Sequence, residues 1–287
     1  MKPSTTPKRE VDIVVISDTH LGAFGCHANE LLSYLKSIKP GLLILNGDII
    51  DIWQFRKSYF PKSHMLVIRQ IIGLIAKKTN VVYICGNHDE LLRRFIPLKI
   101  SSFSLTNKLL INLDHKKAWI FHGDVFDVTM QYSKWLAKLG SVGYDLLIMI
   151  NSIVNFLLEK TGREKISFSK KIKHTVKTAV SYINKFEETA AEIAISKGYS
   201  HVICGHIHQP EIRKISNQDG EVVYLNSGDW VENLSSLEYH KGVWRIYRYR
   251  EDEFIKSFIE GEMEPENLND KETFSKLLQE FKLVQKF

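Results

Sequence analysis

Five short segments of this sequence carry side chains that commonly bind divalent metal ions, and each segment follows a run of apolar residues. The segments are Asp18-Thr19-His20, Gly47-Asp48, Gly86-Asn87-His88-Asp89, His122-Gly123-Asp124 and Gly205-His206-Ile207-His208. Aspartate, asparagine and histidine supply oxygen and imidazole ligands, which suit manganese, iron, zinc or nickel. The segments contain no cysteine thiolate, so a structural zinc site is not expected there. The residue types favour a catalytic metal centre.

The spacing within the segments also suits metal binding. Alternate side chains of an extended chain point to the same side, so the pairs Asp18/His20 and His206/His208 can each face one ion. The glycines permit tight turns and close backbone approach. Two ions about 4 Å apart share one carboxylate and can clamp a phosphoryl group during in-line hydrolysis. The pattern therefore predicts a two-metal phosphoesterase.

Each motif has an ordinary structural alternative when it stands alone. An isolated Asp-x-His or His-x-His pair is usually part of a loop, and a single Gly-Asp is usually a turn. Asn87 or Asp89 could cap a helix. The five motifs together, each after an apolar run, are much harder to obtain by chance. Their joint occurrence favours the metal site.

The elements that must position these segments follow an alternating pattern. Apolar runs predict strands over residues 11–17, 42–45, 81–85, 119–121 and 201–204, with further strands over 221–225 and 242–249. Helical spacing predicts helices over residues 30–38, stopped by Pro40, and 65–77. Alternation of strand and helix is typical of parallel strands joined by crossover helices, which is an α/β fold. Ligands of such sheets bind beyond the carboxyl ends of the strands, where the five motifs would converge.

Residues from about 129 to 197 have a helical composition and predict an insertion between two strands. Residues 142–158 are strongly apolar but shorter than the ~20 residues that span a bilayer. We expect this part of the insertion to form a lid over the metal site and to contact acyl chains or a membrane. Packing against the core and a dimer interface remain alternatives. The basic residues 163–177 could hold phosphates or form a solvated helix face.

Composition limits the cellular setting. The chain has 287 residues, a formal net charge of +6 and three cysteines, Cys26, Cys85 and Cys204, which form no close pair. A sparse, odd set of cysteines indicates a reducing compartment. Residues 1–10 are polar and basic, so no secretory signal is expected. These features predict a cytoplasmic protein, and the positive charge suits an anionic partner.

The motifs together resemble those of the calcineurin-like metallophosphoesterases, and the resemblance covers Val11 to Tyr249. It implies a four-layer α/β/β/α sandwich over residues 11–250, with the helical insertion, and leaves 251–287 as a C-terminal helical tail. It implies that Asp18, His20 and His208 hold one metal ion, that Asn87, His122 and His206 hold the other, and that Asp48 bridges both. His88 would lie near the scissile phosphate. The implied catalytic residues are His88 and Asp48, and the implied substrate contacts are Asn87, His88 and His206.

Within that superfamily the chain is similar to the UDP-2,3-diacylglucosamine diphosphatase group. The similarity rests on residues 47–53, GDIIDIW, on the insertion after His122-Gly-Asp124, and on residues 226–230, NSGDW. It implies cleavage of an acylated sugar nucleotide to UMP and a diacylated sugar 1-phosphate in lipid A biosynthesis. It also implies two divalent ions, manganese first and iron or zinc as alternatives, and a possible peripheral contact with the inner face of the membrane. The best-studied branch has arginine where this chain has His88, which widens the range of substrates to consider.

Two other classes of function compete with this interpretation. A nuclease or nucleotide phosphodiesterase would fit the basic charge, but the sequence lacks interleaved aromatic and basic residues for binding bases, so nucleic acid is a disfavoured partner. A non-catalytic scaffold of the same fold could lose metal ligands freely. Here all seven ligand positions and His88 are filled, which favours an enzyme.

Several residues near the motifs have a functional and a structural interpretation. Trp53 and Trp230 could stack on a base or sugar, or pack in the core. Asp51, Asp89 and Asp124 could orient ligand histidines or cap surface turns. Cys85 and Cys204 end predicted strands, so we expect them to be buried and unreactive.

Overall fold

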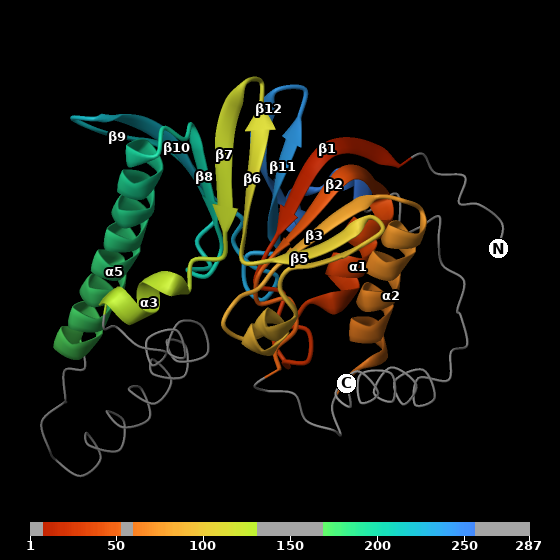
Figure 1. The fold of residues 1–287 in the computed structure, drawn as a ribbon. Helices are drawn as coiled ribbons and strands as arrows, with labels where there is room; N and C mark the ends of the chain where they lie inside the picture. Colours follow the sequence, from red (N-terminus) through yellow and green to blue (C-terminus); the bar gives the residue numbers. More distant parts are fainter. Residues whose placement is uncertain (1–7, 53–59, 131–168, 256–287) are drawn as a thin grey trace, which may run out of the picture.

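The computed structural model describes residues 8–52, 60–130 and 169–255 (Figure 1). Seven strands form one sheet in the order β12-β11-β1-β2-β3-β5-β4. Their bounds are β1 Arg9–Ile16, β2 Ile38–Asn46, β3 Asn80–Ile84, β4 Leu98–Ile100, β5 Phe103–Thr106, β11 Ser235–His240 and β12 Val243–Arg248. Strands β1, β2, β3 and β5 are parallel, so their carboxyl ends lie at one edge.

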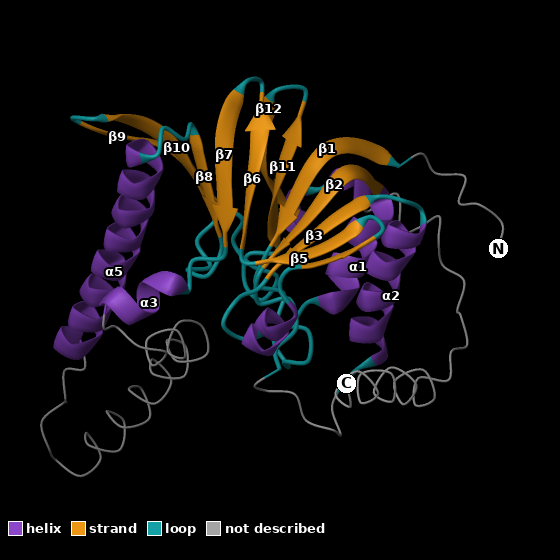
Figure 2. Cartoon of the chain, viewed as in Figure 1, coloured by secondary structure: helices purple, strands orange, loops and turns teal. Residues whose placement is uncertain are grey.

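Five further strands form the second sheet, in the order β6-β7-β8-β10-β9. Their bounds are β6 Lys108–Leu113, β7 Lys116–Phe121, β8 His201–Cys204, β9 Glu211–Asn217 and β10 Gly220–Asn226. The three central strands β7, β8 and β10 are parallel. Both sheets therefore present the carboxyl ends of their central strands, and Figure 2 shows the connecting loops collected where these ends meet.

Helices cover the outer face of each sheet (Figures 1 and 2). The helices are α1 Ala28–Ser37, α2 Lys62–Ala76, α3 Val125–Met130 and α5 Ser169–Ser196, with short 3-10 helices η1 Glu90–Phe95 and η3 Tyr249–Glu251. Helices α1 and α2 lie on the seven-stranded sheet, whereas α3 and α5 lie on the side of the five-stranded sheet. The described part of the chain is therefore a four-layer α/β/β/α sandwich, as the sequence predicts.

Strand β1 shows how alternating side chains build these layers. Val14 and Ile16 join the core under α1 and α2. Ile13 and Val15 point the other way, into a core shared with the five-stranded sheet. Because successive side chains of a strand face opposite sides, an almost continuous apolar run is what a strand buried on both faces requires.

Helix α5 closes the fourth layer. Phe186 and the alanines 190, 191 and 194 are fully buried against the outer face of β8 and β10. Alanine side chains let the helix approach the sheet closely. Helix α5 lies within the predicted insertion, residues 129–197, and yet it forms a layer of the sandwich itself. The apolar residues 142–158 lie outside the described residues, as do Trp53 and the tail beyond residue 255.

Pro40 does not terminate the first predicted helix, which ends one residue earlier than expected. Helix α1 ends at Ser37, and Pro40 lies inside β2, paired in register with Val11 of β1. The neighbouring strand β3 begins to pair only at Leu42, so β2 is flanked by β1 alone at this level. Proline is tolerated there because one side of the strand needs no ladder hydrogen bond.

No helix in the described part of the chain is long and apolar enough to cross a membrane.

Candidate metal centre

Five of the predicted metal ligands share an unusual backbone conformation. Their φ angles are positive: Asp18 52°, His20 49°, Asp48 54°, His206 69° and His208 54°. Left-handed backbone costs a non-glycine residue roughly 1–3 kcal/mol and persists only where the surroundings enforce it. Such strain clusters at functional sites. We therefore interpret the strained loops that carry these residues as parts of a functional site.

The loops are held together by hydrogen bonds between residues far apart in the sequence. The amide of Asp18 donates to the carbonyl of Gly47 at 3.0 Å, and the amide of His20 donates to the carbonyl of Asp48 at 3.0 Å. The amide of His206 donates to Asp18 Oδ2 at 3.0 Å, which joins the two sheets. Backbone and side chain together therefore fix the ligand loops in one arrangement.

Two glycines are required by close packing around Asp48. A Cβ atom at Gly86 would lie 2.2 Å from Asp48 Oδ1, and a Cβ atom at Gly47 would lie 2.3 Å from the ring of His122. Both distances are far shorter than real carbon contacts. The absence of a side chain at these positions is what allows Asp48 and His122 to approach each other, with His122 Nε2 3.3 Å from Asp48 Oδ2.

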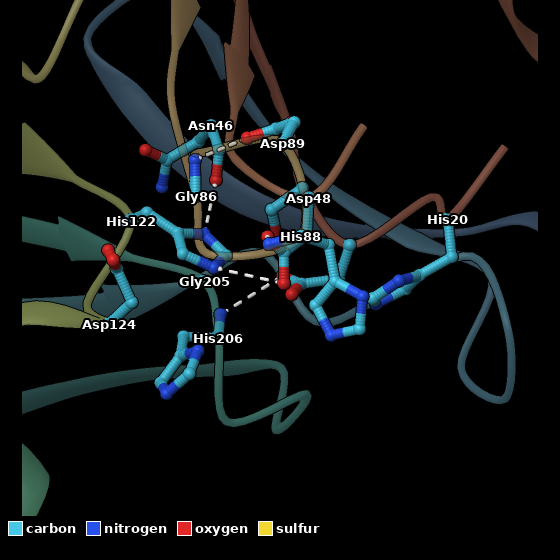
Figure 3. Close-up of polar contacts among 12 residues, drawn as sticks. His20, Asn46, Asp48, Gly86, His88, Asp89, His122, Asp124, Gly205 and His206 are labelled. Atoms are coloured by element: carbon cyan, nitrogen blue, oxygen red, sulfur yellow. Dashed lines mark hydrogen bonds and ion pairs between the residues drawn. The ribbon is translucent and has the colours of Figure 1, made fainter. Parts of the chain in front are cut away.

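The predicted aspartate and histidine ligands, together with His88, form three overlapping clusters. They are Asp18, His20 and His208; His20, Asp48 and His88; and Asp48, His122 and His206. Within each cluster the potential ligand atoms lie within 4.8 Å of one another. His20 and Asp48 each belong to two clusters, so the three form one continuous site. Figure 3 shows Asp48 between His122 and His20, with His88 beside it.

Several buried ligand atoms of this site lack a hydrogen-bond partner. Among the described residues they include His20 Nε2 and Asn87 Oδ1. Asp18 Oδ1 and His122 Nε2 make no hydrogen bond of good geometry either, although His208 Nε2 lies 3.2 Å from the first and Asp48 Oδ2 3.3 Å from the second. Buried polar atoms without partners are rare and costly in proteins. All four can donate a lone pair to a cation. This donor set of carboxylate, amide and imidazole groups therefore fits divalent metal ions.

The carboxylates and histidines of the site shift one another's pKa values. Burial acts to raise the pKa of Asp18, but His208 and His122 outweigh it and bring the pKa to about 2. Burial acts to lower the pKa of His208, but Asp18 above all raises it to about 9. His122 beside Asp48 likewise has its pKa raised despite burial, and the pKa of Asp48 is lowered. The buried carboxylates of Asp18 and Asp48 are thus paired with positive charge, a role that metal ions can take.

Neighbouring groups orient the histidine rings. His122 Nδ1 lies 2.8 Å from the carbonyl oxygen of Asn46, an acceptor, so Nδ1 carries the proton and Nε2 faces Asp48 (Figure 3). Asp51 is fully buried, and its Oδ2 lies 3.1 Å from His88 Nδ1 and 3.5 Å from His20 Nδ1. Burial acts to lower the pKa of His88, but the hydrogen bond with Asp51 and the nearby Asp48 raise it.

The three aspartates expected to orient histidines have different contacts. Asp51 meets that expectation. The carboxylate of Asp89 instead accepts from the amides of Gly86 and Ile49 and from the hydroxyl of Tyr83, at 2.6, 2.9 and 2.6 Å. It fixes the loop backbone. Asp124 accepts from Arg93 at 2.6 Å. Both are structural supports of the ligand loops rather than histidine partners.

Asp127 and Tyr182 are site residues that the sequence motifs do not mark. Asp127 Oδ1 lies 2.9 Å from His206 Nε2 and accepts a hydrogen bond from Tyr182 at 2.6 Å. Burial acts to raise the pKa of Asp127, but its hydrogen bond with His206 outweighs this and lowers the pKa. The only sequence signal is that Asp127 lies three residues after Asp124 in a helix. Tyr182 carries no signal, because folding alone brings it near.

The remaining predictions concern apolar residues. Trp230 is fully buried and stacks on Tyr34 with ring centroids 5.4 Å apart, so it packs in the core. Cys85 and Cys204 are buried as expected, and burial raises the pKa of Cys85 to about 12. All three cysteines are free thiols.

Comparison with known proteins gives a consistent result. The family model described as calcineurin-like phosphoesterase matches residues 11–210. A UDP-2,3-diacylglucosamine hydrolase of Aliivibrio fischeri is 24% identical over 241 residues, covering 82% of this chain and 98% of that protein. The enzyme of the same name from Wigglesworthia glossinidia brevipalpis is 27% identical and covers 79% of this chain and 90% of its own.

Solved structures also match over most of the chain. A novel archaeal phosphodiesterase aligns with a TM-score of 0.39 at 16% identity, covering 82% of this chain and 98% of that one. The family model spans well over half of the sequence and ends at the last of the predicted metal-binding motifs. The chain belongs to the calcineurin-like phosphoesterase family and is a metal-dependent hydrolase.

Proposed function

We propose that the protein uses two divalent metal ions to hydrolyse the phosphoanhydride of UDP-2,3-diacylglucosamine, which yields UMP and 2,3-diacylglucosamine 1-phosphate. The observation that carries the proposal is the overlap of the three Asp/His clusters through His20 and Asp48. A shared carboxylate is what a pair of ions a few ångströms apart requires.

The proposed ligands divide into two sets around Asp48. Asp18, His20 and His208 would hold one ion, and Asn87, His122 and His206 would hold the other, with Asp48 common to both. The unpartnered atoms at Asp18, His20, Asn87 and His122 support these sets. Manganese is the first expectation, and iron or zinc are alternatives that the same donors accept. Bound there, the ions would polarise the phosphoryl group and make water more acidic.

His88 and Asp51 supply the proton chemistry in this proposal. With Asp51 at Nδ1, the ring of His88 is oriented and Nε2 is the nitrogen that exchanges a proton with substrate. The hydrogen bond with Asp51 and the charge of Asp48 raise the pKa of His88 despite burial, which favours the protonated ring. Asn87, His88 and His206 are the proposed contacts of the scissile phosphate, since all three follow the strand ends that surround the site.

A lipid-bearing substrate is supported by the names of the relatives, and exposed apolar residues close to the ligand motifs in the sequence are compatible with it. Phe24, Leu91 and Val125 are 73%, 48% and 51% exposed. Each comes three or four residues after a proposed ligand in the sequence, namely His20, Asn87 and His122, which follow β1, β3 and β7. We therefore place the enzyme in the cytoplasm, with peripheral contact at the inner face of the membrane where such a substrate resides.

Product analysis tests the proposal. The purified protein with manganese should convert UDP-2,3-diacylglucosamine to UMP and a sugar 1-phosphate, detected by phosphorus NMR. A simple aryl phosphodiester and a short single-stranded DNA serve as competing substrates. Faster cleavage of the nucleic acid, with binding that weakens steeply as salt rises, would contradict the proposal in favour of a nuclease.

A further inference from the structure

Helix α5 reaches the proposed metal ligand His206 through two side chains one helical turn apart. Tyr182 and Phe186 are four residues apart and so share one face of the helix. Phe186 is fully buried, and its ring centroid lies 6.3 Å from that of His206. Tyr182 reaches the same histidine through Asp127. The ring is thus held by an apolar contact and by a polar one.

Asp127 Oδ1 is the acceptor at the centre of the polar contact. The hydroxyl of Tyr182 donates to it at 2.6 Å, and His206 Nε2 lies 2.9 Å from it. An ionised carboxylate only accepts hydrogen bonds, so His206 must carry a proton on Nε2. Nδ1 is then the nitrogen with a lone pair for a metal ion. A carboxylate bound to the far nitrogen of a ligand histidine fixes its tautomer and direction.

We propose that Asp127 and Tyr182 are positioning residues that set the tautomer and direction of His206, and that α3 and α5 thereby control the affinity of the site for one of its two ions. The inference rests on the proposed function, because it takes His206 as a ligand. Asp127 lies on α3 and Tyr182 on α5, so two helices far apart in the sequence both act on His206.

Metal titration of purified variants tests this role. Asp127→Ala should weaken binding of one manganese ion about 10–100-fold, the usual effect of losing a partner of a ligand histidine, and leave the other ion nearly unchanged. Tyr182→Phe should act in the same direction by a few-fold. Asp127→Asn keeps an acceptor oxygen and should recover part of the lost affinity. With cobalt in place of manganese, the visible absorption bands of Asp127→Ala should change, because the ligand geometry of one ion changes.

A second tyrosine–aspartate pair provides matched controls. Tyr239 donates to Asp114 at 2.7 Å, between β11 and the turn before β7. This pair lies at the end of the strands opposite to the ligand loops, because the turn precedes β7 whereas His122 follows it. Tyr239→Phe and Asp114→Ala should bind both ions with wild-type affinity.

Two results would overturn the inference. One is Asp127→Ala binding both ions with wild-type affinity and a wild-type cobalt spectrum. The other is equal weakening of both ions together with a lower melting temperature of the metal-free protein, which indicates general structural support. If Asp127→Ala does not fold, Asp127→Asn and Tyr182→Phe give the same comparison. The proposed function fails separately, if the wild-type protein binds fewer than two ions or does not release UMP.

Discussion

At the scale of single residues, Asp51 connects two histidines of the site. Its buried Oδ2 lies within 3.1 Å of His88 Nδ1 and 3.5 Å of His20 Nδ1. One carboxylate therefore orients a proposed metal ligand and the proposed proton donor together. This arrangement explains how His88 can act beside the metal site while its ring direction stays fixed.

Replacement of His88 by alanine should leave both ions bound and slow turnover unequally. An alkyl or aryl leaving group needs protonation, and loss of a positioned acid typically costs about 10²–10⁴-fold. A phosphate leaving group has a second pKa near ~6 and leaves with less help. The measurement compares kcat for an aryl diester and for the sugar-nucleotide pyrophosphate in wild-type protein and His88→Ala. Equal losses on both substrates would contradict the assigned role.

The Asp18–His208 pair should give the metal-free protein a pH-dependent stability. His208 has its pKa raised from 6.5 to about 9, so its contribution is complete below 6.5 and is lost as pH rises through about 9. Asp18 has its pKa lowered from 3.8 to about 2, so its contribution is complete above 3.8 and is lost as pH falls through about 2. The pair should therefore stabilise most between these limits.

Urea unfolding of metal-free wild-type protein and Asp18→Asn measures this effect. The stability difference between the two should be larger at about pH 5.5 than at about pH 10, because His208 loses its charge at the higher pH. A difference that stays constant over this range would show that the pair contributes nothing through its charges.

Individual residues also show where sequence patterns stop being informative. His20, Asp48 and the other predicted aspartate and histidine ligands stand in short motifs at strand ends, so their grouping could be predicted. Asp89 and Asp127 are both aspartates in or close to a ligand motif. Asp89 nevertheless binds loop amides, whereas Asp127 binds a histidine. Only the direction of each side chain, which depends on the fold, separates these roles.

At the scale of elements, the turn after β3 should tolerate no side chain at Gly86. A Cβ atom there would lie 2.2 Å from Asp48 Oδ1 and 2.6 Å from the amide nitrogen of Asp48. Gly86→Ala should displace Asp48, destabilise the protein by a few kcal/mol and weaken metal binding. Thermal unfolding and metal titration measure both effects.

Gly73 offers a matched control in α2. A Cβ atom there meets nothing within 4 Å. Gly73→Ala should stabilise the protein by roughly 0.4–1 kcal/mol, because alanine restricts the unfolded chain, and should leave metal binding unchanged. If both variants behaved alike, the close packing around Asp48 would not be what requires the glycine.

The strands that could be predicted are the buried central ones. β1, β2, β3, β7 and β8 are apolar because neighbours cover both faces, and that composition is visible in the sequence. Edge strands such as β9, with its exposed charged residues, lack this signal. β11 was not predicted either, because its Ser235, Ser236 and Glu238 are buried polar residues. Glu238 accepts hydrogen bonds from Arg245 on β12 and also from Arg9 and Tyr34, 229 and 204 residues away, and no local pattern can indicate the two distant partners.

The apolar stretch of residues 142–158 remains a prediction from sequence. If it forms a lid that contacts acyl chains, Ile148→Ser and Phe156→Ser should raise KM for the diacylated substrate and spare a small soluble diester. The length and composition of the stretch motivate this expectation. A parallel loss of both activities together with a lower melting temperature would indicate that the stretch packs against the core instead.

At the scale of the whole molecule, the sandwich places one site across two sheets. Asp18, Asp48 and Asn87 follow strands of the seven-stranded sheet, whereas His122 and His206 follow strands of the other. Metal ions bound between them would tie the sheets together. Ligand binding to the folded state should then raise stability, by about 2.7 kcal/mol at a hundred times the dissociation constant.

We expect catalysis to need two ions that share Asp48. The most direct test titrates metal-free protein with manganese while bound metal and UMP release are measured on the same samples. Hydrolysis of UDP-2,3-diacylglucosamine should appear only as the second ion binds, and Asp48→Ala should lose both the second ion and the activity. Full turnover with one ion per chain, or an Asp48→Ala protein that keeps two ions and full activity, would contradict the account.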